Sequence, residues 1–140
     1  MLVDTNIWLI AADHRSALHP QITDLLGTSV WASPTPVIAE SAWLILDRLG
    51  TGPHQKFLRL ITAGQLEPIE LTTRDWDRCE ELCATYADLS LDLVDASLIA
   101  VAERLNETQI ATFNYRDFAV VRPAHIDSFD LLPGPARRRQ

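Results

Sequence analysis

Residues 92–113, with the sequence DLVDASLIAVAERLNETQIATF, decide the fold that we expect for this chain. Residues 92–105 predict a helix, because their apolar side chains recur at helical spacing on one face. These apolar residues are Val94, Leu98, Val101, Ala102 and Leu105. After Asn106, the segment 109–113 is short and mostly apolar, and it predicts a strand. A helix that leads into a buried strand is typical of α/β proteins.

The rest of the chain shows the same alternation. We expect strands at residues 1–3, 29–33, 66–71 and 126–131, and helices or helical turns at residues 7–10, 19–26, 36–49, 53–64, 73–86 and 115–118. Helices of this length between strands imply right-handed crossovers and a mostly parallel sheet covered on both faces. In such a sheet the functional site lies at the carboxyl ends of the strands, where the strand order reverses.

Length and composition indicate one globular domain. We expect residues 1–132 to form it and residues 133–140 to form a disordered basic tail.

The net charge of -7 argues against a protein that coats nucleic acid nonspecifically, because such binding depends on Lys and Arg. No apolar run approaches the roughly 18 residues of a membrane span, so we expect a cytoplasmic protein with no membrane partner. Cys79 and Cys83 lack a second pair to complete a zinc site and are expected to be reduced packing residues.

Polar side chains follow two of the predicted strands. Asp4 comes directly after the first strand, and Thr112, Asn114 and Asp117 lie at the end of strand 109–113 or just beyond it. Because the carboxyl ends of parallel strands meet at one edge of a sheet, we expect these side chains to share a pocket. Each also has a structural interpretation: Asp4 suits a helix N-cap, and Asn and Asp are common in turns.

Two further acids lie on predicted helices. Glu40 shares a helix face with Trp43 and Leu44, so its carboxylate is expected to point partly inward; the alternative is a partly exposed glutamate near a helix start. Asp95 shares a face with apolar residues three, four and seven positions later, which turns it toward the sheet. Asp92 either caps this helix or joins Asp95, and both interpretations stay open.

Several carboxylates converge in one pocket only when a cation offsets their repulsion. Oxygen ligands suit hard ions, so the sequence predicts Mg²⁺, with Mn²⁺ as a substitute, rather than zinc.

Four short blocks, in this order, resemble the motifs of PIN-domain ribonucleases and especially of the VapC toxins of bacterial toxin–antitoxin pairs. The blocks are Leu2-Val3-Asp4-Thr5-Asn6, Val37-Ile38-Ala39-Glu40, Leu93-Val94-Asp95-Ala96 and Ala111-Thr112-Phe113-Asn114-Tyr115-Arg116-Asp117-Phe118. Each block is weak alone, but four in order over most of the chain make a specific signal.

The resemblance implies a three-layer α/β/α sandwich and a homodimeric endoribonuclease toxin, a hydrolase that cleaves RNA phosphodiester bonds with Mg²⁺-activated water. It also implies inhibition by a cognate VapB-type antitoxin. By position in the motifs, the catalytic acids and principal metal ligands are Asp4, Glu40 and Asp95. Further metal ligands are possible at Asp92, Asn114 and Asp117, and RNA-binding or supporting roles fall to Thr5, Asn6, Thr112 and Arg116.

The sequence departs from the family at one position. The fourth acid of the motif set is replaced by Asn114, which offers a carbonyl oxygen but no charge. One or two metal ions are therefore both compatible with the sequence. The same departure keeps an alternative open, a catalytically inactive PIN-like module that binds RNA or protein.

Overall fold

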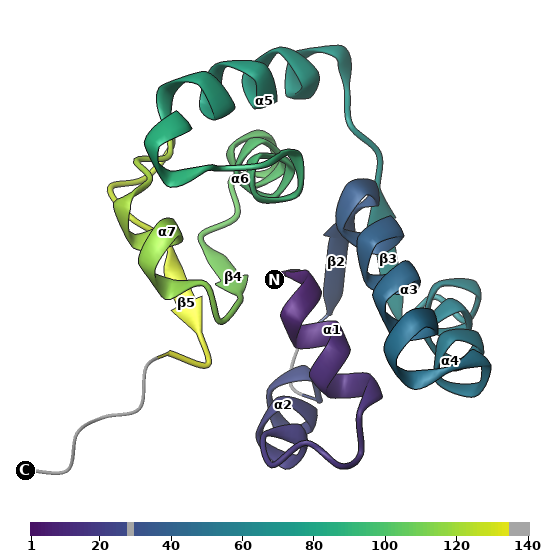
Figure 1. Cartoon of the computed structure of the whole chain (residues 1–140). Helices are drawn as coiled ribbons and strands as arrows, with labels where there is room; N and C mark the ends of the chain where they lie inside the picture. Colours follow the sequence, from purple (N-terminus) through teal and green to yellow (C-terminus); the bar gives the residue numbers. More distant parts are fainter. Residues whose placement is uncertain (28–29, 135–140) are drawn as a thin grey trace, which may run out of the picture.

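The computed structural model describes residues 1–27 and 30–134, in which strands and helices alternate (Figure 1). The strands are β1 (Leu2–Val3), β2 (Trp31–Pro34), β3 (Leu66–Ile69), β4 (Gln109–Ala111) and β5 (Asp130–Leu132). The helices are α1 (Thr5–Ala12), α2 (His19–Leu26), α3 (Thr35–Leu49), α4 (Thr51–Thr62), α5 (Thr73–Thr85), the 3-10 helix η1 (Ala87–Leu89), α6 (Leu93–Leu105) and α7 (Tyr115–Val120).

The five strands form one parallel sheet in the order β3-β2-β1-β4-β5. In the central strand β1, Leu2 pairs with Ala32 of β2 and with Ile110 of β4. The chain leaves β1 toward β2 on one side and returns to β4 on the other, so the strand order reverses at β1. This reversal places the carboxyl ends of β1 and β4 side by side, where α/β proteins form their sites.

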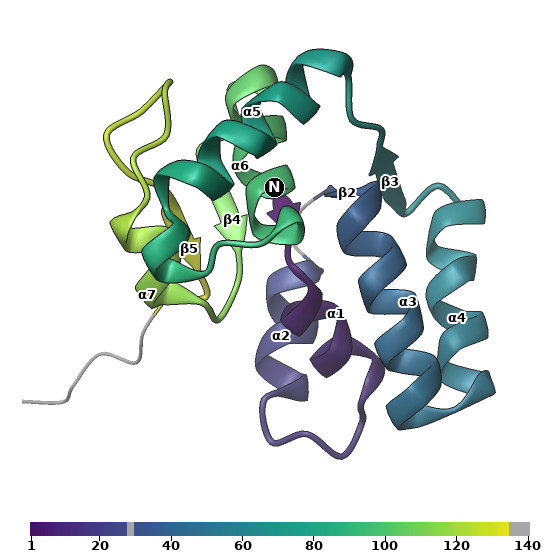
Figure 2. The same ribbon diagram turned by 45° about the horizontal axis from the view of Figure 1, so that its top comes forward.

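Two groups of helices cover the sheet. Helices α1, α2, α3 and α4 pack against one another, and α5 packs along α6. Figure 1 shows α6 above and α1 below the strands β2 and β4, and Figure 2 shows these elements from a second direction. The architecture is therefore the expected three-layer α/β/α sandwich.

Helix α6 was predicted most clearly from the sequence, and its position in the core explains this. Residues from Ala96 to Ala102 are all buried, because the helix lies between the sheet, α3 and α5. The prediction that Leu105 belongs to the apolar face was wrong, since Leu105 is 47% exposed at the end of the helix. On the other side of the sheet, the indole of Trp8 packs edge-on against Trp31 and Phe57, with ring centroids 5.8 and 5.6 Å apart.

Most predicted elements are confirmed with shifted ends. Helix α4 begins two residues before the predicted residue 53, because Gly50 with φ 94° ends α3 and lets the chain turn at once into the next helix. The predicted strand 126–131 was misplaced, since β5 begins only at Asp130. The strand predicted from residue 29 begins, within the described residues, at Trp31. The 3-10 turn η1 was not predicted, and the predicted basic tail lies mostly outside the described residues.

Two predictions from composition can be compared with the structure. Cys79 and Cys83 are free thiols, Cys79 buried and Cys83 half-buried, as expected for packing residues. Among the described residues, no helix has the length and apolar character needed to cross a membrane.

Candidate active site

A polar pocket of about 340 Å³ opens at the carboxyl ends of β1 and β4. It is lined by side chains from α1, α3, the start of α6 and the segment after β4: Asp4, Thr5, Asn6, Glu40, Leu44, Asp92, Val94, Asp95, Phe113 and Asn114. The fold thus brings together the three acids predicted to be catalytic, with Asp92 and Asn114 beside them. They come from four separate parts of the chain.

Asp4 is the deepest of these acids, with 5% of its surface exposed. It is the N-cap of α1, and its Oδ1 accepts a 2.7 Å hydrogen bond from the backbone N–H of Thr5, while Oδ2 accepts a 2.8 Å bond from the Thr112 hydroxyl. Burial raises the pKa of the Asp4 carboxyl, the hydrogen bonds from Thr112 and Thr5 lower it, and the charges of Glu40 and Asp92 raise it. The capping and pocket interpretations of Asp4 are therefore both correct.

Glu40 reaches the same pocket from α3. Its Oε2 accepts a 2.8 Å hydrogen bond from the Thr5 hydroxyl, so the residue after Asp4 links the two acids. The expectation that Glu40 points partly inward is confirmed, and Leu44 lines the pocket with it. Trp43 does not share this environment: it is 64% exposed, because the core side of α3 is formed by Val37, Ser41 and Ile45 instead.

Asp92 and Asp95 stand together at the start of α6. Asp92 is exposed and caps the helix, with Oδ1 accepting a 2.9 Å hydrogen bond from the Asp95 backbone N–H, yet it also lines the pocket. Asp95 is half-buried, as its helical face predicted. Burial, followed by the charges of Asp92 and Asp4, raises the pKa of the Asp95 carboxyl to about 7. Its pKa shows that negative charge is costly in this pocket.

The segment after β4 closes the pocket with an amide rather than an acid. The backbone N–H of Asn114 donates a 3.0 Å hydrogen bond to the Thr112 hydroxyl, and the Asn114 amide nitrogen donates a 3.2 Å bond to the Asp117 carboxylate. Asn114 lines the pocket, whereas Asp117 does not. Arg116 is exposed on α7 and does not line the pocket.

The donor set fits a hard divalent cation. Four carboxylates and the two amide side chains of Asn6 and Asn114 border the pocket. Burial, and to a smaller extent the neighbouring carboxylates, raise the pKa values of Asp4 and Asp95, and a bound cation would offset both effects. Within residues 1–27 and 30–134, no three His, Cys, Asp or Glu side chains converge as a preformed metal-binding group. The acids border one pocket of about 340 Å³ without closing on a single point.

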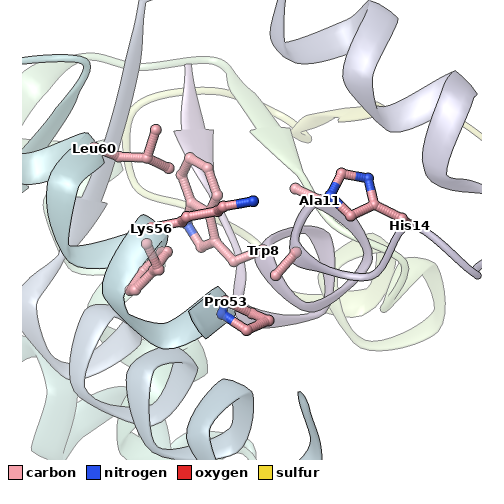
Figure 3. Close-up of a pocket in the computed structure, with 8 residues that line it drawn as sticks. Trp8, Ala11, His14, Pro53, Lys56 and Leu60 are labelled. Atoms are coloured by element: carbon pink, nitrogen blue, oxygen red, sulfur yellow. The ribbon is translucent and has the colours of Figure 1, made fainter. Parts of the chain in front are cut away.

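A second cavity of about 260 Å³ has different chemistry. It lies between α1 and α4 and is lined by Trp8, Ala11, Ala12, His14, Pro53, Lys56, Phe57 and Leu60. Figure 3 shows the Lys56 side chain next to the Trp8 indole and the His14 ring on the opposite side of the cavity. The lining contains no carboxylate, so this cavity lacks the ligands of the polar pocket.

The family model that describes the PIN domain matches residues 1–122 of this chain. The chain belongs to the PIN-domain family. Membership supports nuclease activity in general, and PIN nucleases generally use divalent metal ions. A search of curated proteins finds no match.

Solved structures of other PIN-like proteins share the fold. VapC20 of Mycobacterium tuberculosis, described as a sarcin-ricin loop cleaving toxin, has a TM-score of 0.75 and 17% identity, covering 82% of this chain and 90% of its own. A toxin–antitoxin complex from Klebsiella pneumoniae gives 0.65 and 22%, covering 89% and 98%. VapBC2 from Rickettsia felis, bound to a DNA fragment from its promoter, gives 0.66 and 17%, covering 93% and 96%. At these identities the likeness shows the fold alone.

Two residues that line the pocket, and one hydrogen bond within it, were not predicted from the sequence. Val94 and Phe113 line it, although the sequence marked them only as apolar neighbours of Asp95 and Asn114. The hydrogen bond from Thr5 to Glu40 was also missed, because it joins residues 35 positions apart. Only a contact between the first turn of α1 and the second turn of α3 creates it, and no local spacing in the sequence signals that contact.

Proposed function

We propose that this PIN domain is a Mg²⁺-dependent endoribonuclease, with Mn²⁺ able to substitute, in which Asp4, Glu40 and Asp95 are the catalytic acids. The observation that carries the proposal is the convergence of these three acids, from three separate elements, on one pocket. A cluster whose carboxylates have raised pKa values is suited to receive a cation.

The residues of the pocket have distinct roles in this mechanism. Thr112 and the Thr5 backbone fix both oxygens of Asp4, and the Thr5 hydroxyl orients Glu40, so the two acids keep their separation without a ligand. When bound, a divalent ion supplies charge neutralisation for the phosphate and lowers the pKa of water. Asp95 contributes its charge once its proton is lost. Asn6 lines the pocket and offers an uncharged contact for RNA.

Asn114 bears on how many ions the pocket holds and on whether the domain is catalytic. Its amide nitrogen is engaged by Asp117, so its carbonyl oxygen is the atom left for a ligand. We assign one ion to Asp4 and Asp95, and a second, weaker position to Asp92 and Asn114. The alternative function is a PIN-like module without catalysis, which the missing negative charge at position 114 favours. Such a module would bind RNA but would not cleave it when divalent ions are added.

The biological role that we propose is a VapC-type toxin acting in the cytoplasm as a homodimer and inhibited by a VapB-type antitoxin. The support comes from the similar folds of a toxin–antitoxin complex and of VapBC2. We further propose that residues 1–132 form the nuclease domain and that the basic tail is dispensable for cleavage. Sedimentation of the full chain and co-purification with the product of the adjacent reading frame test the assembly.

The deciding experiment is cleavage of single-stranded RNA by the full chain at rising Mg²⁺ concentration. Asp4→Asn, Glu40→Gln and Asp95→Asn should each lower the rate by at least about a hundredfold, because Asp4 and Asp95 lose a charge that holds the ion and Glu40 loses a charge beside it. The control Asp88→Asn changes an exposed aspartate away from the pocket. Circular dichroism checks the fold. Unchanged cleavage by Asp95→Asn, or cleavage in EDTA, overturns the proposal.

A further inference from the structure

The side of α5 next to the acid pocket carries a hollow of about 310 Å³, which we call the Trp76 hollow. It is lined by Trp76, Asp77, Cys79, Glu80, Cys83 and Leu93. Four of these residues recur at positions i, i+3, i+4 and i+7 of α5, so they form one continuous stripe along the helix. The cysteine spacing that formed no zinc site belongs to this stripe.

Consecutive residues at the start of α6 line the hollow and the acid pocket. Leu93, the first residue of α6, forms one wall of the hollow, and its neighbours Asp92 and Val94 line the acid pocket. The Cys83 thiol lies within electrostatic reach of the acids, since after burial the charges of Asp92 and Asp95 are what raise its pKa. A ligand in the acid pocket therefore has the hollow immediately beside it.

The chemistry of the hollow fits a planar, uncharged group that donates hydrogen bonds. Trp76 is 51% exposed and Leu93 39% exposed, so an indole face and an aliphatic edge are available to a flat partner. Asp77 and Glu80 are exposed and make no salt bridge with the described residues. Their carboxylates repel a phosphate but accept hydrogen bonds from amino groups.

We propose that the Trp76 hollow holds one base of the RNA, next to the bond that is cut, with the indole stacked on the base and Asp77 and Glu80 accepting hydrogen bonds from its amino group. Adenine, cytosine and guanine carry an exocyclic amino group with two N–H donors, whereas uracil offers a single N3–H donor between two carbonyl oxygens, which the carboxylates repel; the hollow therefore selects against uracil at one position. Base stacking also supplies binding that this acidic protein does not obtain from the lining of the acid pocket, which contains no Lys or Arg.

The inference rests on the proposed ribonuclease function, and its test separates the two. A random-sequence pool of single-stranded RNA is cleaved by the full chain, and the new ends are sequenced. Wild type should disfavour uracil about tenfold at one position beside the cut. Trp76→Ala should raise KM by about tenfold and remove this preference, with a smaller change in kcat, and Trp76→Phe should keep most of both. Asp77→Asn with Glu80→Gln should weaken the discrimination against uracil.

Trp43→Ala is the matched control, because it removes an exposed indole that does not line the hollow; its base preference should equal that of wild type. An unaltered preference and KM in Trp76→Ala overturn the inference while leaving the ribonuclease in place. A loss of dimer in Trp76→Ala, seen by sedimentation, assigns the hollow to a contact between copies and also overturns it. If wild type cuts no RNA, the proposed function fails. Quenching of tryptophan fluorescence by adenosine-rich RNA in EDTA, lost in Trp76→Phe, then still tests the hollow alone.

Discussion

The hydroxyl of Thr112 donates a 2.8 Å hydrogen bond to the carboxylate of Asp4, which lies 108 positions earlier in the chain. Both residues are buried, and each directly follows one of the two adjacent strands β1 and β4. The same hydroxyl accepts a hydrogen bond from the Asn114 backbone. Thr112 therefore positions the deepest acid of the pocket and the segment that closes it.

Thr112→Val should damage both stability and cleavage. It leaves a buried Asp4 oxygen without its donor, which should lower the free energy of unfolding by about 1–3 kcal/mol. Because partners of metal-binding side chains typically contribute one to two orders of magnitude, we expect cleavage to fall about 10- to 100-fold. Denaturant unfolding and RNA cleavage measure the two effects. Thr112→Ser should recover most of both, and Thr108→Val provides an exposed control; a fully active Thr112→Val would contradict the positioning role.

The sequence was sufficient to predict the acids of the pocket but not their connections. Asp4 and Asp95 were found because an acid at a strand end, or on the apolar face of a helix, is visible as a local pattern. The threonine that holds Asp4, and the one that orients Glu40, act across long separations in the chain. Such contacts exist only after β1 has been placed between β2 and β4.

The ends of the strands were predicted less exactly than the strands themselves. β4 ends at Ala111 rather than at the predicted Phe113, although Thr112 still donates its backbone N–H to Leu132 of β5.

The Trp76 hollow was not predicted from the sequence. Trp76 and Leu93 belong to different helices, and the sequence gives no measure of how α5 packs along α6.

The raised pKa of Asp95 predicts how the metal-free protein responds to pH. A folded-state pKa of about 7, above the ordinary aspartate value of 3.8, means that ionising Asp95 is harder in the folded chain. The contribution of this group to stability is therefore complete below about pH 4 and is lost as the pH rises through 7. In EDTA at pH 8, Asp95→Asn should melt a few degrees above wild type, and the difference should shrink as the pH falls and disappear below about pH 4.

Calorimetric melting of both proteins across this pH range makes the measurement. Asp47→Asn, at an exposed position on α3, controls for the loss of one negative charge. Saturating Mg²⁺ should reverse the order at pH 8, because wild type then gains the binding free energy of the ion. A difference between wild type and Asp95→Asn that stays constant with pH would show that Asp95 is not under the repulsion described above.

Asp92→Asn separates the capping role of Asp92 from its charge. Asn caps helices as well as Asp does, so the hydrogen bond to the Asp95 backbone should persist and the free energy of unfolding should change little. The charge of Asp92 raises the pKa of Asp95, so its removal should lower that pKa below about 7. NMR titration of the Asp95 carboxyl carbon in the metal-free protein measures this change. Asp92→Ala loses the cap as well and should cost about 1 kcal/mol; equal stability of the two variants would argue against capping.

Asn114→Asp tests the position at which this PIN domain departs from the family pattern. The new carboxylate should tighten metal binding and lower the Mg²⁺ concentration needed for half-maximal cleavage, because a charged ligand replaces a neutral one. In the metal-free protein the same change places two carboxylates within hydrogen-bonding distance, since the Asn114 amide nitrogen now donates to Asp117 at 3.2 Å. We therefore expect Asn114→Asp to gain metal affinity and to lose stability without metal.

The exchange of the two residues separates these effects. In Asn114→Asp with Asp117→Asn, the amide at position 117 donates to the carboxylate at position 114, so the metal-free stability should return toward that of wild type while the tighter metal binding remains. Asp117→Asn alone should leave metal affinity unchanged, because Asp117 does not line the pocket. Calorimetric titration with Mg²⁺ and thermal melting in EDTA compare the four proteins. If Asp117→Asn alone weakened metal binding as much as Asp95→Asn does, the fourth acid of this site would be Asp117, and Asn114 would serve only to position it.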